Sequence, residues 1–179
     1  MPGSSPTGVI TPERFAQTPT FDEYVARMTV NKERMLQHVD EVEISEADLA
    51  WWRGRGKLNV YTLTFDGCGD ALYNIPVMAK IAKLCPNVDL RVAQRDENLD
   101  VMDRYLNQGT YRSVPTFVFL DEQFAEIGNL KERPPSMTEV VEQEMVRVRR
   151  RLREENKVPW RAEVVREFRA VVENRKQYP

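Results

Sequence analysis

The stretch "LNVYTLTFDGCGDALYNIPVMAKIAKL" (residues 58–84) changes its hydrophobic pattern halfway along, around a single cysteine. Residues 58–65 are rich in β-branched and aromatic side chains, which is typical of a strand, whereas residues 71–84 carry apolar side chains at helical spacing. Pro76 lacks a backbone N–H donor and therefore predicts a kink in that helix. Cys68 lies where the strand ends and the helix begins.

The residues that follow predict further alternation of strand and helix. Residues 88–94, "VDLRVAQ", indicate a second strand, and residues 98–109 indicate a helix that ends at Gly109. The segments "TFVFL" (116–120) and "FAEIG" (124–128) flank three polar residues and predict a hairpin. A strand–helix–strand unit forms a parallel pair through a right-handed crossover, and a hairpin adds antiparallel strands. We therefore expect an α/β fold in which helices cover a mixed sheet.

The flanking regions are different in character. Residues 1–19 are rich in Pro, Gly, Ser and Thr, so we expect a loose arm with at most a short turn. A capping box at Thr20 and Glu23 begins a long amphipathic helix that continues past Met35 to about Val39. The expected parts of the chain are a flexible arm (1–19), N-terminal helices packed on the core (20–56), the core itself (57–135) and a C-terminal extension (136–179) made of two helices over about 136–156 and 160–176.

Composition and charge exclude several classes of function. Lys and Arg number 26 against 28 for Asp and Glu, so the overall charge gives no reason to expect nucleic acid or an anionic membrane as partner. No apolar run approaches the length of a membrane span, and the N-terminus lacks a basic stretch followed by an apolar one, so we expect a cytoplasmic protein. The single histidine, His38, leaves few ways to build a metal site or a Cys–His pair. We expect no cofactor and no bound metal.

The position of Cys68 suggests a reactive thiol. Backbone N–H groups and the helix dipole at a helix N-terminus favour the thiolate, which is the attacking species. Asp66 and Asp70 lie close by in sequence and oppose a second negative charge. Arg112 would offset them if its loop packs against the cysteine. These opposing effects leave the net change in the Cys68 pKa open.

Four segments, in the order in which they occur, resemble the thioredoxin-like superfamily. They are "CGDALYNIPVMAKIAK" (68–83), "RDENLDVMDRYLNQG" (95–109), "RSVPTFVFLD" (112–121) and "KERP" (131–134). More narrowly, they resemble bacterial thioredoxin family proteins of the Trp-Cys-Gly-Asp type, here with one active-site cysteine in Gly-Cys-Gly-Asp-Ala. The resemblance covers about Thr20 to Pro134.

This resemblance implies a thioredoxin-like three-layer α/β/α sandwich. Its four-stranded mixed sheet would be ordered 88–94, 58–65, 115–120, 124–128, with a cis Val114–Pro115 bond facing the cysteine. The candidate catalytic residue is Cys68. The candidate substrate-binding residues are Gly67, Gly69, Asp70, Arg112, Val114 and Pro115.

The sequence also departs from the family in ways that limit the chemistry. Ala71 occupies the position of the second cysteine, Gly67 that of the family's tryptophan, and Thr62 that of its buried acid. Cys85 lies at the far end of the predicted helix, roughly 20 Å or more from Cys68, which is too far for a disulfide. A two-cysteine cycle within the chain is therefore excluded.

Three functions remain open at the level of sequence. The first is a monothiol oxidoreductase, in which Cys68 forms a mixed disulfide with a low-molecular-weight thiol or a client protein. The second is a non-redox module that binds peptides or proteins in the cis-proline cleft. The third is an interaction protein that acts through its C-terminal helices, with a homodimer through those helices as one arrangement. The arginines between residues 147 and 153 are interleaved with glutamates and fit a solvated face better than a phosphate site.

Overall fold

A computed structural model describes residues 8–155, 161–162 and 165 of the 179-residue chain. The chain divides into two compact units, Met1–Pro134 and Pro135–Pro179. Within the described residues, no helix combines the length and the apolar character that crossing a membrane requires. The second unit contains α7 (Pro135–Glu155), and most of the helix predicted at 160–176 lies outside the described residues.

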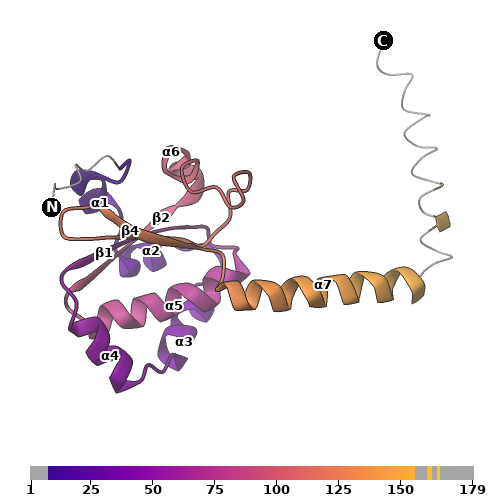
Figure 1. Cartoon of the computed structure of the whole chain (residues 1–179), viewed down its shortest axis with the longest axis horizontal. Helices are drawn as coiled ribbons and strands as arrows, with labels where there is room; N and C mark the ends of the chain where they lie inside the picture. Colours follow the sequence, from indigo (N-terminus) through magenta and orange to yellow (C-terminus); the bar gives the residue numbers. More distant parts are fainter. Residues whose placement is uncertain (1–7, 156–160, 163–164, 166–179) are drawn as a thin grey trace, which may run out of the picture. The chain divides into compact units, whose positions relative to one another are not determined.

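The first unit is built on a four-stranded mixed sheet (Figure 1). The strands are β1 (Leu58–Thr64), β2 (Val88–Gln94), β3 (Thr116–Leu120) and β4 (Glu126–Lys131), in the order β2-β1-β3-β4. β1 and β2 are parallel and are joined by α5 (Gly69–Leu84), whereas β3 is antiparallel to both β1 and β4. The predicted fold class and strand order are confirmed, with β1 inside the sheet.

Helices cover both faces of this sheet, so the first unit has three layers (Figure 1). On one face lie α2 (Phe21–Arg27), α3 (Lys32–Glu41), α4 (Glu46–Arg53) and α5. On the other lie α1 (Pro12–Gln17) and α6 (Leu99–Met102), which follows the short 3₁₀ helix η1 (Arg95–Glu97).

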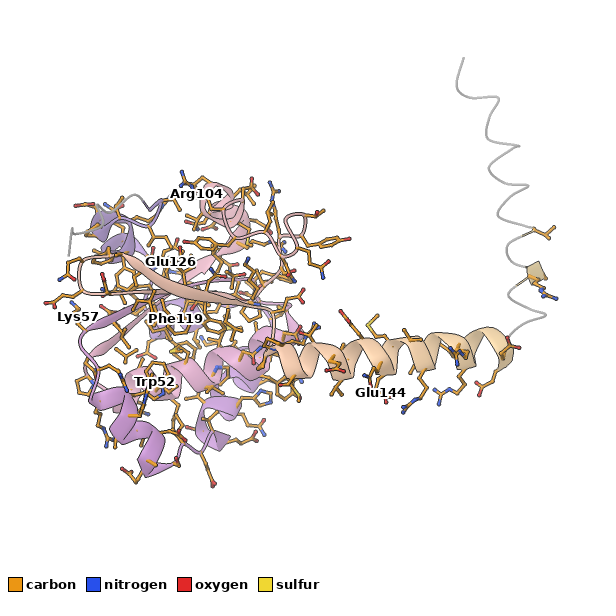
Figure 2. The ribbon with its side chains drawn as sticks, viewed as in Figure 1. Trp52, Lys57, Arg104, Phe119, Glu126 and Glu144 are labelled. Atoms are coloured by element: carbon orange, nitrogen blue, oxygen red, sulfur yellow. The ribbon has the colours of Figure 1, made fainter. Side chains whose placement is uncertain are left out.

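Side chains fill the space on either side of the strands, as Figure 2 shows around Phe119. In β1, Val60 packs with the α5 side, while Tyr61 and Leu63 pack with the α6 side, and all three are fully buried. Burial of one such side chain stabilises the fold by about 1.5–3 kcal/mol.

Part of the segment predicted as a loose arm is helical. Residues 12–17 form α1, where we expected at most a turn. The Thr11 side chain accepts the Arg14 N–H at its start, and Phe15 is buried against the ring of Phe124. The sequence pattern does not reveal this helix, because its single large apolar side chain cannot show a helical period of hydrophobic residues. The surrounding residues are also rich in Pro and Thr.

The long helix predicted from Thr20 to about Val39 is broken in two. The capping box at Thr20 and Glu23 is present, but α2 ends at Arg27, and Asn31 has a φ of 63° before α3 begins. The break is held by Asp66, whose carboxylate accepts the Thr29 N–H and whose carbonyl accepts from the Asn31 side chain. The apolar spacing continues across the break because both helices pack into the same cluster.

Two other boundaries differ from the sequence prediction. The helix predicted over 98–109 stops at Met102, and a bridge between Asn107 and Tyr111 closes a turn instead. The hairpin turn is also longer than expected, because the Asp121 carboxylate accepts two backbone N–H groups and delays β4 to Glu126. In both places, short-range turn contacts end the regular element.

Candidate functional site

Cys68 is the N-cap residue of α5. Its backbone is extended, and its Sγ accepts the Ala71 N–H at 3.4 Å, in the way that a Ser or Thr oxygen caps a helix. The side chain is partly exposed. Cys85 caps the opposite end of the same 16-residue helix and is completely buried. Of the two cysteines, Cys68 is the one that solvent reaches.

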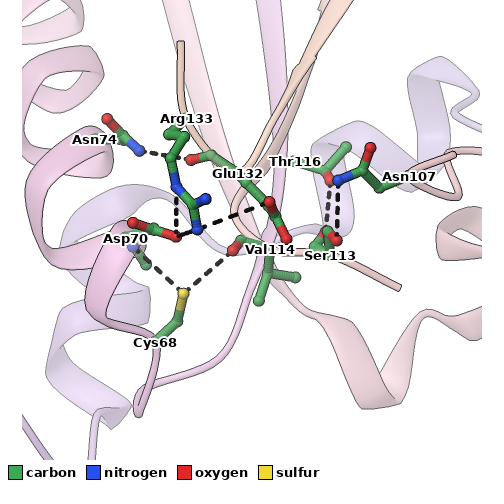
Figure 3. Close-up of polar contacts among 10 residues, drawn as sticks. Cys68, Asp70, Asn74, Asn107, Ser113, Val114, Thr116, Glu132 and Arg133 are labelled. Atoms are coloured by element: carbon green, nitrogen blue, oxygen red, sulfur yellow. Dashed lines mark hydrogen bonds and ion pairs between the residues drawn. The ribbon is translucent and has the colours of Figure 1, made fainter. Parts of the chain in front are cut away.

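The loop before β3 faces this thiol (Figure 3). The Val114–Pro115 peptide bond is cis, and the Val114 carbonyl accepts a hydrogen bond from the Cys68 Sγ at 3.2 Å. The sulfur is thus held between the first turn of α5 and the cis-proline loop. A carbonyl oxygen can only accept, so this contact needs a proton on the sulfur and favours the thiol form.

A charged cluster joins the same two elements to the end of β4 (Figure 3). Arg133 donates from both Nε and Nη2 to one oxygen of Asp70, at 3.2 and 2.5 Å, and its Nη2 lies 3.7 Å from the Glu132 carboxylate. The Glu132 N–H donates to the Pro115 carbonyl at 2.7 Å, and Asn74 donates to the Glu132 carbonyl. These contacts fix two carboxylates and one guanidinium beside the sulfur.

The surroundings of Cys68 raise its pKa. Burial is the largest cause, and the negative charges of Asp70 and Glu132 act in the same direction. The backbone N–H groups of Ala71 and Asp70 oppose this increase without cancelling it. The helix N-terminus therefore provides the expected donors, but partial burial and the acidic neighbours outweigh them.

Arg112 does not offset the charge of Asp70, as its place in the loop before Pro115 suggested it could. Its guanidinium donates to Asp103 at 2.6 and 2.8 Å, and Asp70 is paired with Arg133 instead. The signal for Arg133 was present in "KERP" (131–134), which carries the family resemblance but gives no indication of which partner the arginine takes.

Asp66 is a structural carboxylate. Burial would raise its pKa, but hydrogen bonds from Thr29, Gln94 and Tyr24 outweigh that effect and lower it. The Tyr24 hydroxyl donates at 3.0 Å and the Gln94 amide at 2.9 Å. Asp66 therefore anchors the break between α2 and α3 to the loop that leads into Cys68.

The two glycines beside Cys68 differ in their surroundings. A Cβ on Gly67 would lie 2.8 Å from the ring of Phe65, which is closer than real Cβ atoms approach. That ring also lies under the Arg95 guanidinium, 4.9 Å from its centroid. Phe65 therefore occupies the space that a larger residue at position 67 would need. Gly69 has nothing within 4 Å of its Cβ position, so no such restriction applies there.

We expect Asp70→Asn to make Cys68 more reactive. The substitution removes one of the charges that raise the Cys68 pKa and also removes the nearer of the two carboxylates that pair with Arg133, whose positive charge favours the thiolate. Alkylation of Cys68 at neutral pH should become roughly three- to tenfold faster, since the rate follows the thiolate fraction. Asp103→Asn, which removes the carboxylate paired with Arg112, is the matched control and should leave the rate unchanged. Equal rates in both variants would show that Asp70 does not act on the sulfur.

Comparison with known proteins identifies the fold. The sequence profile of a family described as Thioredoxin matches residues 18–156. Among solved structures, a protein of unknown function, PA1234 from Pseudomonas aeruginosa, is 18% identical, with a TM-score of 0.62 over 75% of this chain and 83% of that one.

A second solved structure, an HIV epitope-scaffold, is 19% identical, with a TM-score of 0.60 over 69% of this chain and 78% of that one. At these identities the likeness concerns the fold alone. None of the curated proteins matches the sequence.

Proposed function

We propose that this chain, which belongs to the thioredoxin family, carries out monothiol thiol–disulfide exchange through Cys68. The observation that supports this most directly is the position of the sulfur. Cys68 is partly exposed at the N-terminus of α5 and faces the cis-proline loop, whereas Cys85 is buried. Ala71 leaves no second thiol in the first turn, so the resolving thiol comes from outside the chain.

The exchange proceeds in two balanced steps. The Cys68 thiolate attacks one sulfur of an external disulfide, forms a mixed disulfide and releases the other half as a thiolate. A second external thiolate then attacks the external sulfur of the mixed disulfide, which gives a new disulfide and returns the Cys68 thiolate. The Ala71 N–H, which already contacts Sγ, stabilises the departing thiolate. The substrate class is a low-molecular-weight disulfide or an exposed disulfide on a client protein.

A second candidate function is binding without redox turnover. The hydrogen bond from Cys68 to the Val114 carbonyl and the raised pKa both favour the protonated thiol, which does not attack disulfides. In that case the cis-proline loop and the first turn of α5 would bind an extended peptide, with main-chain groups of the loop as hydrogen-bond partners. Cys68 would then serve as a neutral polar group in the cleft.

Formation of a mixed disulfide separates the two candidates, and the pH dependence of alkylation tests the raised Cys68 pKa on which both depend. Because the Cys68 pKa is raised, we expect its labelling rate to increase about tenfold per pH unit from neutral pH upward, without a plateau near pH 7. At every pH, Cys68 should still label faster than Cys85, which is accessible only after unfolding. Peptide-level mass spectrometry after timed alkylation measures both rates. Exchange is supported if Cys68 also forms mixed disulfides with oxidised glutathione above pH 8, and binding without turnover if it does not.

A further inference from the structure

One face of α7 carries an apolar stripe. Met137, Val141, Met145, Val148 and Leu152 follow one another at spacings of four, four, three and four residues. At about 100° per residue, these positions fall within a narrow band along the helix. The exposed fractions of the Met137, Met145, Val148 and Leu152 side chains lie between 40% and 49%. From Val141 to Leu152 the spacings alternate between four and three, as in a coiled-coil seam, so this part of the face fits another helix.

The two halves of α7 have opposite charge. Residues 135–144 contain three glutamates and no lysine or arginine, whereas residues 145–155 contain five arginines and two glutamates. When two copies of such a helix lie antiparallel, the acidic half of each runs beside the basic half of the other. A parallel pair would place the arginine-rich halves together, which is unfavourable because like charges repel.

We propose that α7 pairs with α7 of a second copy of this chain in an antiparallel, two-fold arrangement. In the register that closes the seam, Met145 meets Val148 of the second copy, and Val141 meets its Leu152. A two-fold interface requires that one surface supply both complementary parts. α7 meets this requirement because one helix carries both an acidic half and a basic half. Binding to an unrelated protein would require the apolar stripe but not these two halves of opposite charge.

The charged residues beside the stripe fit the same register. Glu144 and Arg151 flank it on one side of the helix, seven residues apart, and Figure 2 shows the Glu144 side chain projecting from α7. Antiparallel pairing places Glu144 of each copy beside Arg151 of the other. Within one helix, Glu144 pairs with Arg147 at 2.6 Å and Arg151 with Glu155 at 3.9 Å. Exposed pairs of this kind contribute little, so exchanging them for contacts between copies costs little.

The experiment is sedimentation equilibrium of the full chain over a range of concentrations, in reductant so that disulfide-linked species do not contribute. The mass should increase from 20.9 kDa toward twice that value with concentration. Glu144→Arg and Arg151→Glu should each weaken association roughly tenfold, because each sets like charges together twice per dimer. The double variant should restore it, since the pairs are re-formed with exchanged signs.

Two further variants complete the test. Met145→Glu places charge in the seam and should abolish association, whereas Val146→Glu, at an exposed apolar position on the other side of α7, should not affect it. A mass that stays at 20.9 kDa overturns the proposal. So does a dimer that resists Met145→Glu, because it would form elsewhere. A dimer weakened by each charge reversal but not restored by both together would lack the Glu144–Arg151 pairing between copies and would also overturn it.

Discussion

Replacing Cys68 with serine is expected to abolish every mixed disulfide that this protein forms with oxidised glutathione or with a trapped client. The serine oxygen can still cap α5 through the Ala71 N–H, so the fold is expected to survive the change. It cannot form a disulfide. Because Cys85 is completely buried at the other end of α5, it offers no alternative sulfur in the folded state. Intact-protein mass spectrometry after incubation with oxidised glutathione measures the product directly.

Cys85→Ala is the matched control for that experiment. It removes the buried sulfur without adding a polar group to the core, and the mixed disulfide at Cys68 should form as in the unaltered chain. A glutathione adduct that persists in Cys68→Ser but disappears in Cys85→Ala would show that Cys85 is the reactive cysteine and would contradict the proposed function. Circular dichroism on all three proteins establishes that the comparison is between folded chains.

Ala71→Cys is expected to convert a monothiol protein into a dithiol one. Cys68 caps the helix with an extended backbone, and its Sγ already lies 3.4 Å from the Ala71 nitrogen, so a sulfur on residue 71 would lie close to it. A 68–71 disulfide can therefore close without large backbone movement. An internal resolving thiol acts at a high effective concentration, so reduction of insulin disulfides should rise about tenfold or more above that of the unaltered chain.

The control for this gain is Ala71→Ser. Position 71 is buried, with 1% of its surface exposed, so both variants add a comparable heavy atom to the same packed site. Only the cysteine can resolve a mixed disulfide. If Ala71→Cys forms the internal disulfide and still shows no reductase activity, the scaffold lacks redox competence and the binding function takes precedence. If neither variant changes activity and no disulfide forms, the sulfur of Cys68 does not reach position 71 in solution.

The sequence predicted the strands and the central crossover correctly because the relevant signals are local, and the family resemblance supplied the order of the strands. The β-branched run at 58–65 and the helical spacing at 71–84 each reflect the side-chain period of a single element. The hairpin follows from three polar residues between two apolar runs. These patterns also predicted that Cys68 lies at the start of a helix. The hydrogen bond from the Ala71 N–H to its sulfur follows from that position.

Tertiary contacts decided what those local patterns left open. The helix predicted through Thr29 breaks there because Asp66, 37 residues away, accepts its N–H. Asp70 pairs with Arg133, 63 residues further along, whereas Arg112 takes Asp103. The Cys68 pKa is raised chiefly by burial, and burial depends on how the cis-proline loop and β4 pack against α5. Periodicity and capping act over a few residues, but burial and ion pairing depend on distances in space, which only the folded chain sets.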